Sequence, residues 1–233
     1  GCFSLQSSKL MTAGEGGIII TNRLDCHELV ETIVNCGRAS VTDQFKRRMT
    51  GSNYRMTEFQ AAVLLGQLEQ LPELAGLRSR NAALLTKALA EVPGIRPLPP
   101  QTRQTREHIY NYVFQYQPKD GRVSRDLFAA ALDAEGIPCD GRFYEPVYRS
   151  DLFRGTPEEF PQLSLGRERP VDYRAFHCPV SEKAAYREAV WLPQFLLLGG
   201  EADVEDIARA VQKVMANLDD LAKADPALAR QKS

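Results

Sequence analysis

The sequence predicts an α/β protein made of two parts, and three observations support this prediction. Residues 17–21 form a β-branched apolar run that is followed by a helical pattern over residues 25–35. After residue 100, strand and helix patterns alternate. Of the 233 residues, 43% are hydrophobic and 25% are charged, which are the proportions of a globular protein with a sizeable core.

The first hundred residues contain a predicted strand followed by predicted helices. We expect the run at residues 17–21 to be a buried strand, and residues 25–35 carry an apolar face with helical spacing. Thr57 and Gln60 have the spacing of a capping box and open the next helix. We expect Pro72 to interrupt this helix, a further helix to end near Ala90, and residues 93–100 to form a rigid connector.

The residues after 100 predict a small α/β domain. Residues 109–116 alternate, which places a set of aromatic side chains on the core face of a strand: Tyr110, Tyr112, Phe114 and Tyr116. Ser124 is predicted to cap a helix that ends at Gly136, before a strand at residues 137–143. Ser181 is expected to begin a short helix, residues 190–193 to form a strand, and Asp203 to cap a long final helix. The predicted domains are therefore residues 1–100 and 101–233.

Charge and cysteine content exclude several classes of protein. With 29 basic and 30 acidic side chains the net charge is −1, whereas a nucleic-acid-binding protein needs a basic surface. The longest apolar run, residues 191–198, is too short to span a bilayer. The five cysteines form no CxxC pair and the histidines have no metal-ligand spacing. We therefore expect no metal site, and reduced thiols in a cytoplasmic protein.

Residues 4–17 have the clearest chemical potential in the sequence. Lys9 lies between a stretch rich in serine and glutamine and the glycine-rich turn at residues 14–17. A lysine amine that loses its proton can form an imine with a carbonyl compound, hydroxyls can hold a phosphate, and glycines allow the backbone to approach closely. Composition alone leaves open the alternative of an ordinary surface lysine before a β-turn.

Four segments of the chain occur in the same order as in a known enzyme family. They are residues 4–21 (SLQSSKLMTAGEGGIIIT), 51–71 (GSNYRMTEFQAAVLLGQLEQL), 136–153 (GIPCDGRFYEPVYRSDLF) and 178–193 (CPVSEKAAYREAVWLP). Over nearly its whole length the chain resembles the DegT/DnrJ/StrS family, the pyridoxal-phosphate (PLP)-dependent sugar and cyclitol aminotransferases. The resemblance implies the aspartate aminotransferase-like fold, called fold type I.

The resemblance also implies which parts of this fold the chain contains. They are the C-terminal part of the large PLP-binding domain with interdomain helices, followed by the small C-terminal α/β domain. The N-terminal part of the family is expected to be missing. That part supplies the aspartate facing the pyridine nitrogen and the group stacked on the ring, so the chain alone is expected to be inactive.

The resemblance assigns roles to individual residues. Lys9 matches the lysine that binds the cofactor as a Schiff base, and Ser4 matches a hydroxyl that binds its phosphate. Asn53 matches an asparagine that reaches the cofactor phosphate of the neighbouring subunit, which implies a homodimer with shared sites; the alternative is a turn asparagine beside Gly51. Gln6 matches a cofactor-site glutamine found in cyclitol-type members and aminohydroxybenzoate synthases; the alternative is a solvated loop amide.

The resemblance implies a reaction as well. Tyr144 and Tyr148 match a loop that approaches the substrate, although many members have histidine in place of Tyr148, and packing is their alternative role. We expect transamination of a keto-sugar or keto-cyclitol, with glutamate or glutamine as donor, in antibiotic, secondary-metabolite or cell-surface sugar biosynthesis. Two alternatives stay open: an aromatisation like that of aminohydroxybenzoate synthase, and a non-catalytic member that acts as regulator or dimer partner.

Overall fold

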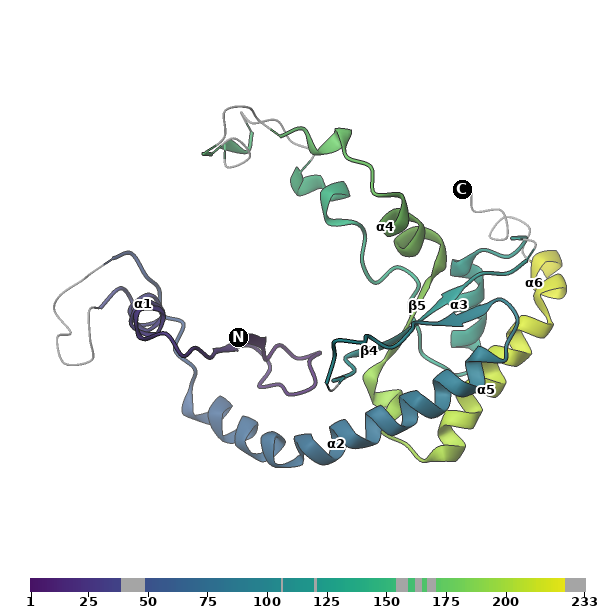
Figure 1. The fold of residues 1–233 in the computed structure, drawn as a ribbon, viewed down its shortest axis with the longest axis horizontal. Helices are drawn as coiled ribbons and strands as arrows, with labels where there is room; N and C mark the ends of the chain where they lie inside the picture. Colours follow the sequence, from purple (N-terminus) through teal and green to yellow (C-terminus); the bar gives the residue numbers. More distant parts are fainter. Residues whose placement is uncertain are drawn as a thin grey trace. The chain divides into compact units, whose positions relative to one another are not determined.

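The computed structural model describes residues 1–38, 49–105, 107–119, 121–153, 159–161, 165–166 and 171–224. The chain divides into two compact units, residues 1–75 and residues 76–233 (Figure 1). The helix α2 (Glu58–Ala90) begins in the first unit and ends in the second. A division into domains at residue 100 stays a prediction. Helices and short antiparallel sheets together make up both units, in agreement with the predicted mixed class.

The first unit begins with a two-stranded antiparallel ribbon. Strand β1 (Cys2–Ser4) pairs with β2 (Gly17–Ile19), with Ser4 opposite Gly17. The predicted strand is therefore present, but the prediction that it is buried was wrong, because Ile19 is 50% exposed and Ile20 is 56% exposed. Within the described residues β2 pairs only with β1, and burial of a ribbon requires further strands or a helix against its face.

Helix α1 (Leu24–Val34) and helix α2 complete the first unit. The capping box is confirmed, since Thr57 N donates to Gln60 Oε1 at 3.0 Å and Gln60 N donates to Thr57 Oγ1 at 3.3 Å. The predicted interruption at Pro72 was wrong, because α2 continues through it. A proline removes one backbone hydrogen bond from a helix. Packing of α2 on both sides of Pro72, at buried Leu64 and Ala75, offsets that loss.

The second unit is built on a three-stranded antiparallel sheet in the order β3-β4-β5. The strands are β3 (Ile95–Pro97), β4 (Asn111–Tyr116) and β5 (Ala189–Pro193), and β4 and β5 confirm two predicted strands. The predicted connector at residues 93–100 instead contains β3, because Ile95 pairs with Tyr116 across the edge of the sheet. The predicted strand at residues 137–143 is reduced to a bridge between Asp140 and Trp191.

Besides the C-terminal half of α2, the described residues of the second unit include four α-helices and several short helical turns (Figure 1). The α-helices are α3 (Arg125–Ala134), α4 (Pro179–Lys183), α5 (Glu201–Ala216) and α6 (Leu218–Ala224). The short helical turns are η1 (Val147–Arg149), η2 (Asp151–Phe153), η4 (Tyr173–Ala175), the π-helix η5 (Ala184–Glu188) and η6 (Gln194–Leu197).

The ends of these helices test several predictions. Ser124 caps α3 by accepting a hydrogen bond from Leu127 N at 3.2 Å, and Gly136 follows the helix with a φ of +89°, as predicted. Helix α4 begins at Pro179 rather than Ser181, since proline suits the first position of a helix. Helix α5 has Gly200 as its N-cap. The predicted cap, Asp203, lies three residues later and accepts from Gly200 N at 2.7 Å.

One hydrophobic core holds the second unit together. Tyr112, Phe114 and Tyr116 alternate into it from β4, which confirms the predicted aromatic core face for these three residues. Tyr110 precedes β4 and is only half-buried, so its predicted place on this face was wrong. Phe128 of α3 stacks on Tyr116 at 4.4 Å and meets Phe114 edge-on at 6.3 Å between ring centroids. Helices α2 and α5 contribute further aliphatic side chains to the same core. Among the described residues, no helix combines the length and the apolar composition that a bilayer crossing requires.

Candidate functional site

The loop between β1 and β2 carries Lys9 and is closed by its own hydrogen bonds. At its base, Leu5 N donates to Gly16 O at 3.0 Å. Further along, Leu5 O accepts from Ala13 N at 3.1 Å and from Thr12 Oγ1 at 3.0 Å. Leu5 itself is only 1% exposed. The residues from Leu5 to Ala13 therefore form a closed sub-loop whose two ends are joined.

Lys9 lies in a tight turn inside this sub-loop. Lys9 N donates to Gln6 O at 2.9 Å, which fixes the backbone on either side of the lysine. The Gln6 side chain belongs to the same turn. Its Oε1 accepts from Ser8 N at 2.9 Å and from Ser8 Oγ at 2.6 Å, and its Nε2 donates to Ser7 Oγ at 2.8 Å. Gln6 thus stabilises the turn in which Lys9 lies.

Ser4 and two glycines form the mouth of the loop. Ser4 ends β1 and is exposed, and its Oγ accepts from Gln6 N at 3.4 Å. Gly16 has a φ of +136°, which side chains rarely tolerate. A Cβ at Gly17 would lie 3.1 Å from Phe3 O. One loop therefore carries a lysine amine, a hydroxyl and closely approaching backbone. These groups suit a ligand that has an aldehyde and a phosphate.

Two glutamines of α2 hold the loop, and the sequence analysis did not identify these contacts. Gln67 Oε1 accepts from Thr12 N at 2.9 Å, and Gln67 Nε2 donates to Thr12 O at 2.7 Å. Gln60 Nε2 donates to Glu15 O at 2.8 Å while its Oε1 serves the capping box. The signal that was available is their spacing of seven residues, which places both amides on one face of a helix.

Asn53 lies on a segment that is hydrogen-bonded to the end of α1. Ser52 N donates to Ile33 O at 3.1 Å and Tyr54 N donates to Val34 O at 3.0 Å, on either side of Asn53. A Cβ at Gly51 would lie 2.6 Å from Ile33 O, so this close approach requires glycine. The Asn53 side chain is exposed at the place where these backbone bonds fix it.

Tyr144 lies in the second unit, at the wall of a cavity. The cavity has a volume of about 1000 Å³ and includes among its lining residues Arg125, Asp126, Arg142, Tyr144, Glu182 and Arg187. Tyr144 is 60% exposed and packs edge-on against Phe143 at 4.5 Å and against Trp191 at 6.0 Å between ring centroids. The Tyr144 ring thus packs against two aromatic side chains and is also exposed to solvent.

Tyr148 is part of a polar cluster around Glu182. Its hydroxyl donates to Glu182 Oε1 at 2.5 Å and accepts from Cys178 N at 3.0 Å. Arg149 Nη2 donates to the same carboxylate oxygen at 2.6 Å, and His177 Nδ1 lies 2.9 Å from Oε2. Hydrogen bonds from Tyr148 and Arg149 lower the pKa of Glu182. Desolvation and the bond to Glu182 raise the pKa of Tyr148.

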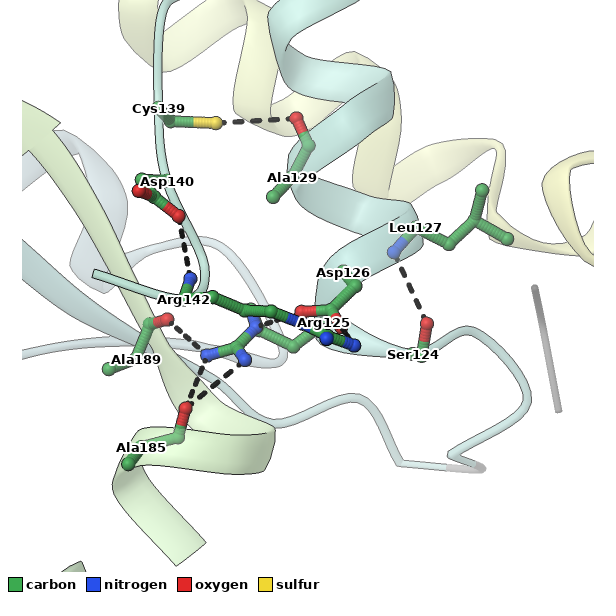
Figure 2. A network of polar contacts seen from close by, with 10 residues as sticks. All are labelled: Ser124, Arg125, Asp126, Leu127, Ala129, Cys139, Asp140, Arg142, Ala185 and Ala189. Atoms are coloured by element: carbon green, nitrogen blue, oxygen red, sulfur yellow. Dashed lines mark hydrogen bonds and ion pairs between the residues drawn. The ribbon is translucent and has the colours of Figure 1, made fainter. Parts of the chain in front are cut away.

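Arg125 anchors the wall of the cavity from inside the protein (Figure 2). Its side chain is 1% exposed, and Nη1 donates to Ala189 O at 2.8 Å and to Ala185 O at 3.1 Å. Arg125 Nε also donates to Asp126 Oδ1 at 2.7 Å. Arg142 donates to the other oxygen of Asp126. Desolvation opposes ionisation of Asp126, but the hydrogen bonds from Arg142 and Arg125 outweigh it and lower the pKa.

The sequence is similar to those of known aminotransferases. It is 42% identical to the proposed L-glutamine:3-amino-2,3-dideoxy-scyllo-inosose aminotransferase of Streptoalloteichus tenebrarius, over 95% of this chain and 54% of that protein. It is 37% identical to the L-glutamine:2-deoxy-scyllo-inosose aminotransferase of the same organism, over 92% of this chain and 53% of that protein. The chain therefore spans about half the length of these curated relatives.

The fold is also similar to a solved structure. The crystal structure of 3-amino-5-hydroxybenzoic acid synthase matches with a TM-score of 0.76 and 29% identity, covering 93% of this chain and 54% of that one. The profile of the DegT/DnrJ/EryC1/StrS aminotransferase family matches residues 1–212. This match covers both units and includes the Lys9 loop, Asn53, Tyr144 and Tyr148. The chain belongs to the DegT/DnrJ/EryC1/StrS aminotransferase family.

Proposed function

We propose that the full-length protein containing this chain is a PLP-dependent aminotransferase. It transfers an amino group from glutamine to a keto-cyclitol, with glutamate and keto-sugars as the alternative donor and acceptors. The observation that carries the proposal is the closed loop that holds Lys9 in a tight turn, because the same loop also carries Ser4 and a glycine-lined backbone. The names of relatives that are 37% to 42% identical support glutamine and a cyclitol as substrates.

PLP, when bound, supplies an aldehyde and an electron-withdrawing ring. The amine of Lys9 would hold PLP through that aldehyde carbon. Once an amino donor is bound, the same amine would take the proton from Cα of the donor and hold it as an ammonium group. The hydroxyl of Ser4 donates to the phosphate. Gln6 keeps the intervening backbone in the turn and would form part of the cofactor site.

Asn53 of the partner subunit reaches the same phosphate, which makes the protein a homodimer with shared sites. The exposure of Asn53 on a segment that backbone hydrogen bonds hold in place supports this role. Tyr144 and Tyr148 are the candidate substrate contacts. The partial solvent contact of Tyr144 at the cavity wall is compatible with such a role. The aspartate that faces the pyridine nitrogen and the group that stacks on the ring would come from the part of the family that this chain does not span.

The test is a transamination assay on the full-length protein with PLP, glutamine and 2-deoxy-scyllo-inosose. We expect formation of the amino-cyclitol and loss of this activity in Lys9→Ala. Replacing glutamine by glutamate distinguishes the two donors. Cofactor absorbance without turnover of any keto-cyclitol or keto-sugar would contradict the proposed reaction. Absence of any cofactor absorbance would support a non-catalytic family member.

A second reaction is favoured by the similarity to 3-amino-5-hydroxybenzoic acid synthase, at a TM-score of 0.76. In that case the full-length protein would convert a cyclic amino ketone into an aromatic amine by loss of water. The ultraviolet absorbance of an aromatic product separates this reaction from transamination, which leaves the cyclitol ring saturated. The assay with 2-deoxy-scyllo-inosose excludes this alternative if the amino-cyclitol forms.

A further inference from the structure

The Lys9 loop is tied to α2 by glutamine side chains. Gln67 pairs both polar atoms of its amide with the backbone of Thr12, at 2.9 Å and 2.7 Å, and Gln60 holds Glu15 O at 2.8 Å. A side-chain amide that accepts from an N–H and donates to the C=O of the same residue fixes both the position and the direction of that backbone. We call this pair of hydrogen bonds between Gln67 and Thr12 the clamp.

The clamp acts on the part of the loop that determines where Lys9 lies. Thr12 is three residues beyond Lys9, and its hydroxyl donates to Leu5 O, at the opposite end of the closed sub-loop. Ala13 N donates to the same oxygen. A displacement of Thr12 therefore moves both ends of the sub-loop and the turn of Lys9 with them. Gln67 is half-buried, which reduces competition from water for the two bonds.

We propose that Gln67 is a positioning residue for the Lys9 amine, with Gln60 as a second support. This inference rests on the proposed function, in which Lys9 moves a proton at a carbon atom. Proton transfer requires the amine within hydrogen-bond reach of that carbon's proton, and small misplacements of a reacting group reduce rates strongly. Gln67 contributes by holding the sub-loop at a fixed place on α2, without touching substrate.

The test compares Gln67→Met with Gln70→Met in the full-length protein. Methionine keeps the length and helix propensity but has no amide, and Gln70 is exposed on the same helix, so it is the matched control. For Gln67→Met we expect kcat to fall about 10- to 100-fold, as for a misplaced catalytic group, with KM for glutamine changed less than about threefold. Gln70→Met should keep both constants.

A second measurement is independent of catalysis. Without cofactor, amide hydrogen exchange at Thr12 should become about 10-fold faster in Gln67→Met and stay unchanged in Gln70→Met, because Thr12 N donates to Gln67 Oε1. In Gln67→Glu, the carboxylate still accepts from Thr12 N but cannot donate to Thr12 O. Its kcat relative to wild type should recover as pH falls, when a protonated carboxyl donates to Thr12 O.

Four results separate failure of the positioning role from failure of the proposed function. Faster exchange with unchanged kcat would show that the clamp is structural only and would overturn the inference. Unchanged exchange and unchanged kcat would overturn it as well. Should Gln67→Met fail to fold, a flat relative pH profile of Gln67→Glu would contradict it. Absence of transamination in the wild-type protein would instead contradict the proposed function, and the positioning role with it.

Discussion

The two units of this chain differ most in what holds them together. The second unit has a continuous core in which Phe114, Phe128 and Val211 are fully buried. In the described part of the first unit, few hydrophobic side chains are buried, Leu5 and Leu64 among them. A larger set there is exposed: Phe3, Ile18, Ile19, Ile20, Leu24, Leu29, Met49, Tyr54, Phe59, Val63, Leu65 and Leu68.

This difference indicates how the Lys9 loop keeps its shape. Burial of apolar area is the main stabilising contribution in a folded domain, and the first unit has little of it. Its loop is instead defined by directional contacts, from Leu5 to Gly16 and Ala13, and from Gln67 to Thr12. Hydrogen bonds fix geometry but add only about 0.5–1.5 kcal/mol each. The proposed chemistry therefore lies in the unit with little buried apolar area, in a loop that hydrogen bonds hold in shape.

The largest expected contrast comes from truncating a large side chain in each unit. Phe128→Ala should lower the free energy of unfolding by about 3–5 kcal/mol, because the side chain is fully buried between Tyr116 and Phe114. Leu65→Ala in the first unit should change it by less than about 0.5 kcal/mol, because Leu65 is 64% exposed.

Urea unfolding of the 233-residue chain measures both effects, with circular dichroism following the helices of both units and fluorescence of the single tryptophan, Trp191, following the second unit. A loss of comparable size in the two variants would break the comparison. It would mean that the apolar surface of the first unit is covered in solution, for example by a second copy of the chain.

A smaller contrast is expected between two arginines of the second unit that share Asp126. Arg125→Met removes the Arg125 donor from the buried carbonyl of Ala189 and the part-buried carbonyl of Ala185 (Figure 2). We expect a loss of about 2–4 kcal/mol, since an unpaired buried polar group costs roughly 1–3 kcal/mol. Arg142→Met removes a salt bridge whose arginine is 71% exposed and should cost less than about 1 kcal/mol.

Thermal or urea unfolding of both variants decides whether burial or the shared ion pair is responsible. Equal losses in Arg125→Met and Arg142→Met would assign the stability to the Asp126 pair. They would contradict the role of Arg125 as a donor to the backbone that carries β5.

The smallest effect concerns the cysteines. Burial, with Asp133 and Asp140 nearby, raises the pKa of Cys139 to about 12, and its thiol donates to Ala129 O at 3.3 Å. Because the thiolate is the reactive form, Cys139 stays protonated and unreactive at pH 8. Cys2 and Cys178 are exposed. Iodoacetamide followed by mass spectrometry should label these two first, and early labelling of Cys139 would indicate opening of the second unit.

The sequence predicted the local features of the fold because neighbouring residues determine them. The capping box at Thr57, the cap at Ser124 and the alternation in β4 each depend on a few adjacent positions, and the structure confirms them. Exposure of β2 and the pairing of β3 with β4 depend on which strands are present elsewhere. The prediction of a break at Pro72 was wrong because packing of α2 on both sides of Pro72 overrides a local helix-breaking signal.

The candidate site divides in the same way. The turn of Lys9 follows from a short motif, and its backbone bonds lie within residues 5–16. Gln67 lies 55 residues from its partner Thr12, so nothing in the local sequence reveals the contact. Arg125 has the same kind of distant partners, the carbonyls of Ala185 and Ala189. Side chains that act over long separations are the part of a site that a single sequence leaves out.

The central claim is that Lys9 in the bonded loop of the first unit carries the cofactor. The most direct measurement is borohydride reduction of the full-length protein with PLP, followed by peptide mapping of the reduced and permanently attached cofactor. We predict attachment on the peptide that contains Lys9, and none in the Lys9→Ala variant. Attachment to another lysine in the wild-type protein, or undiminished attachment in Lys9→Ala, would contradict the claim.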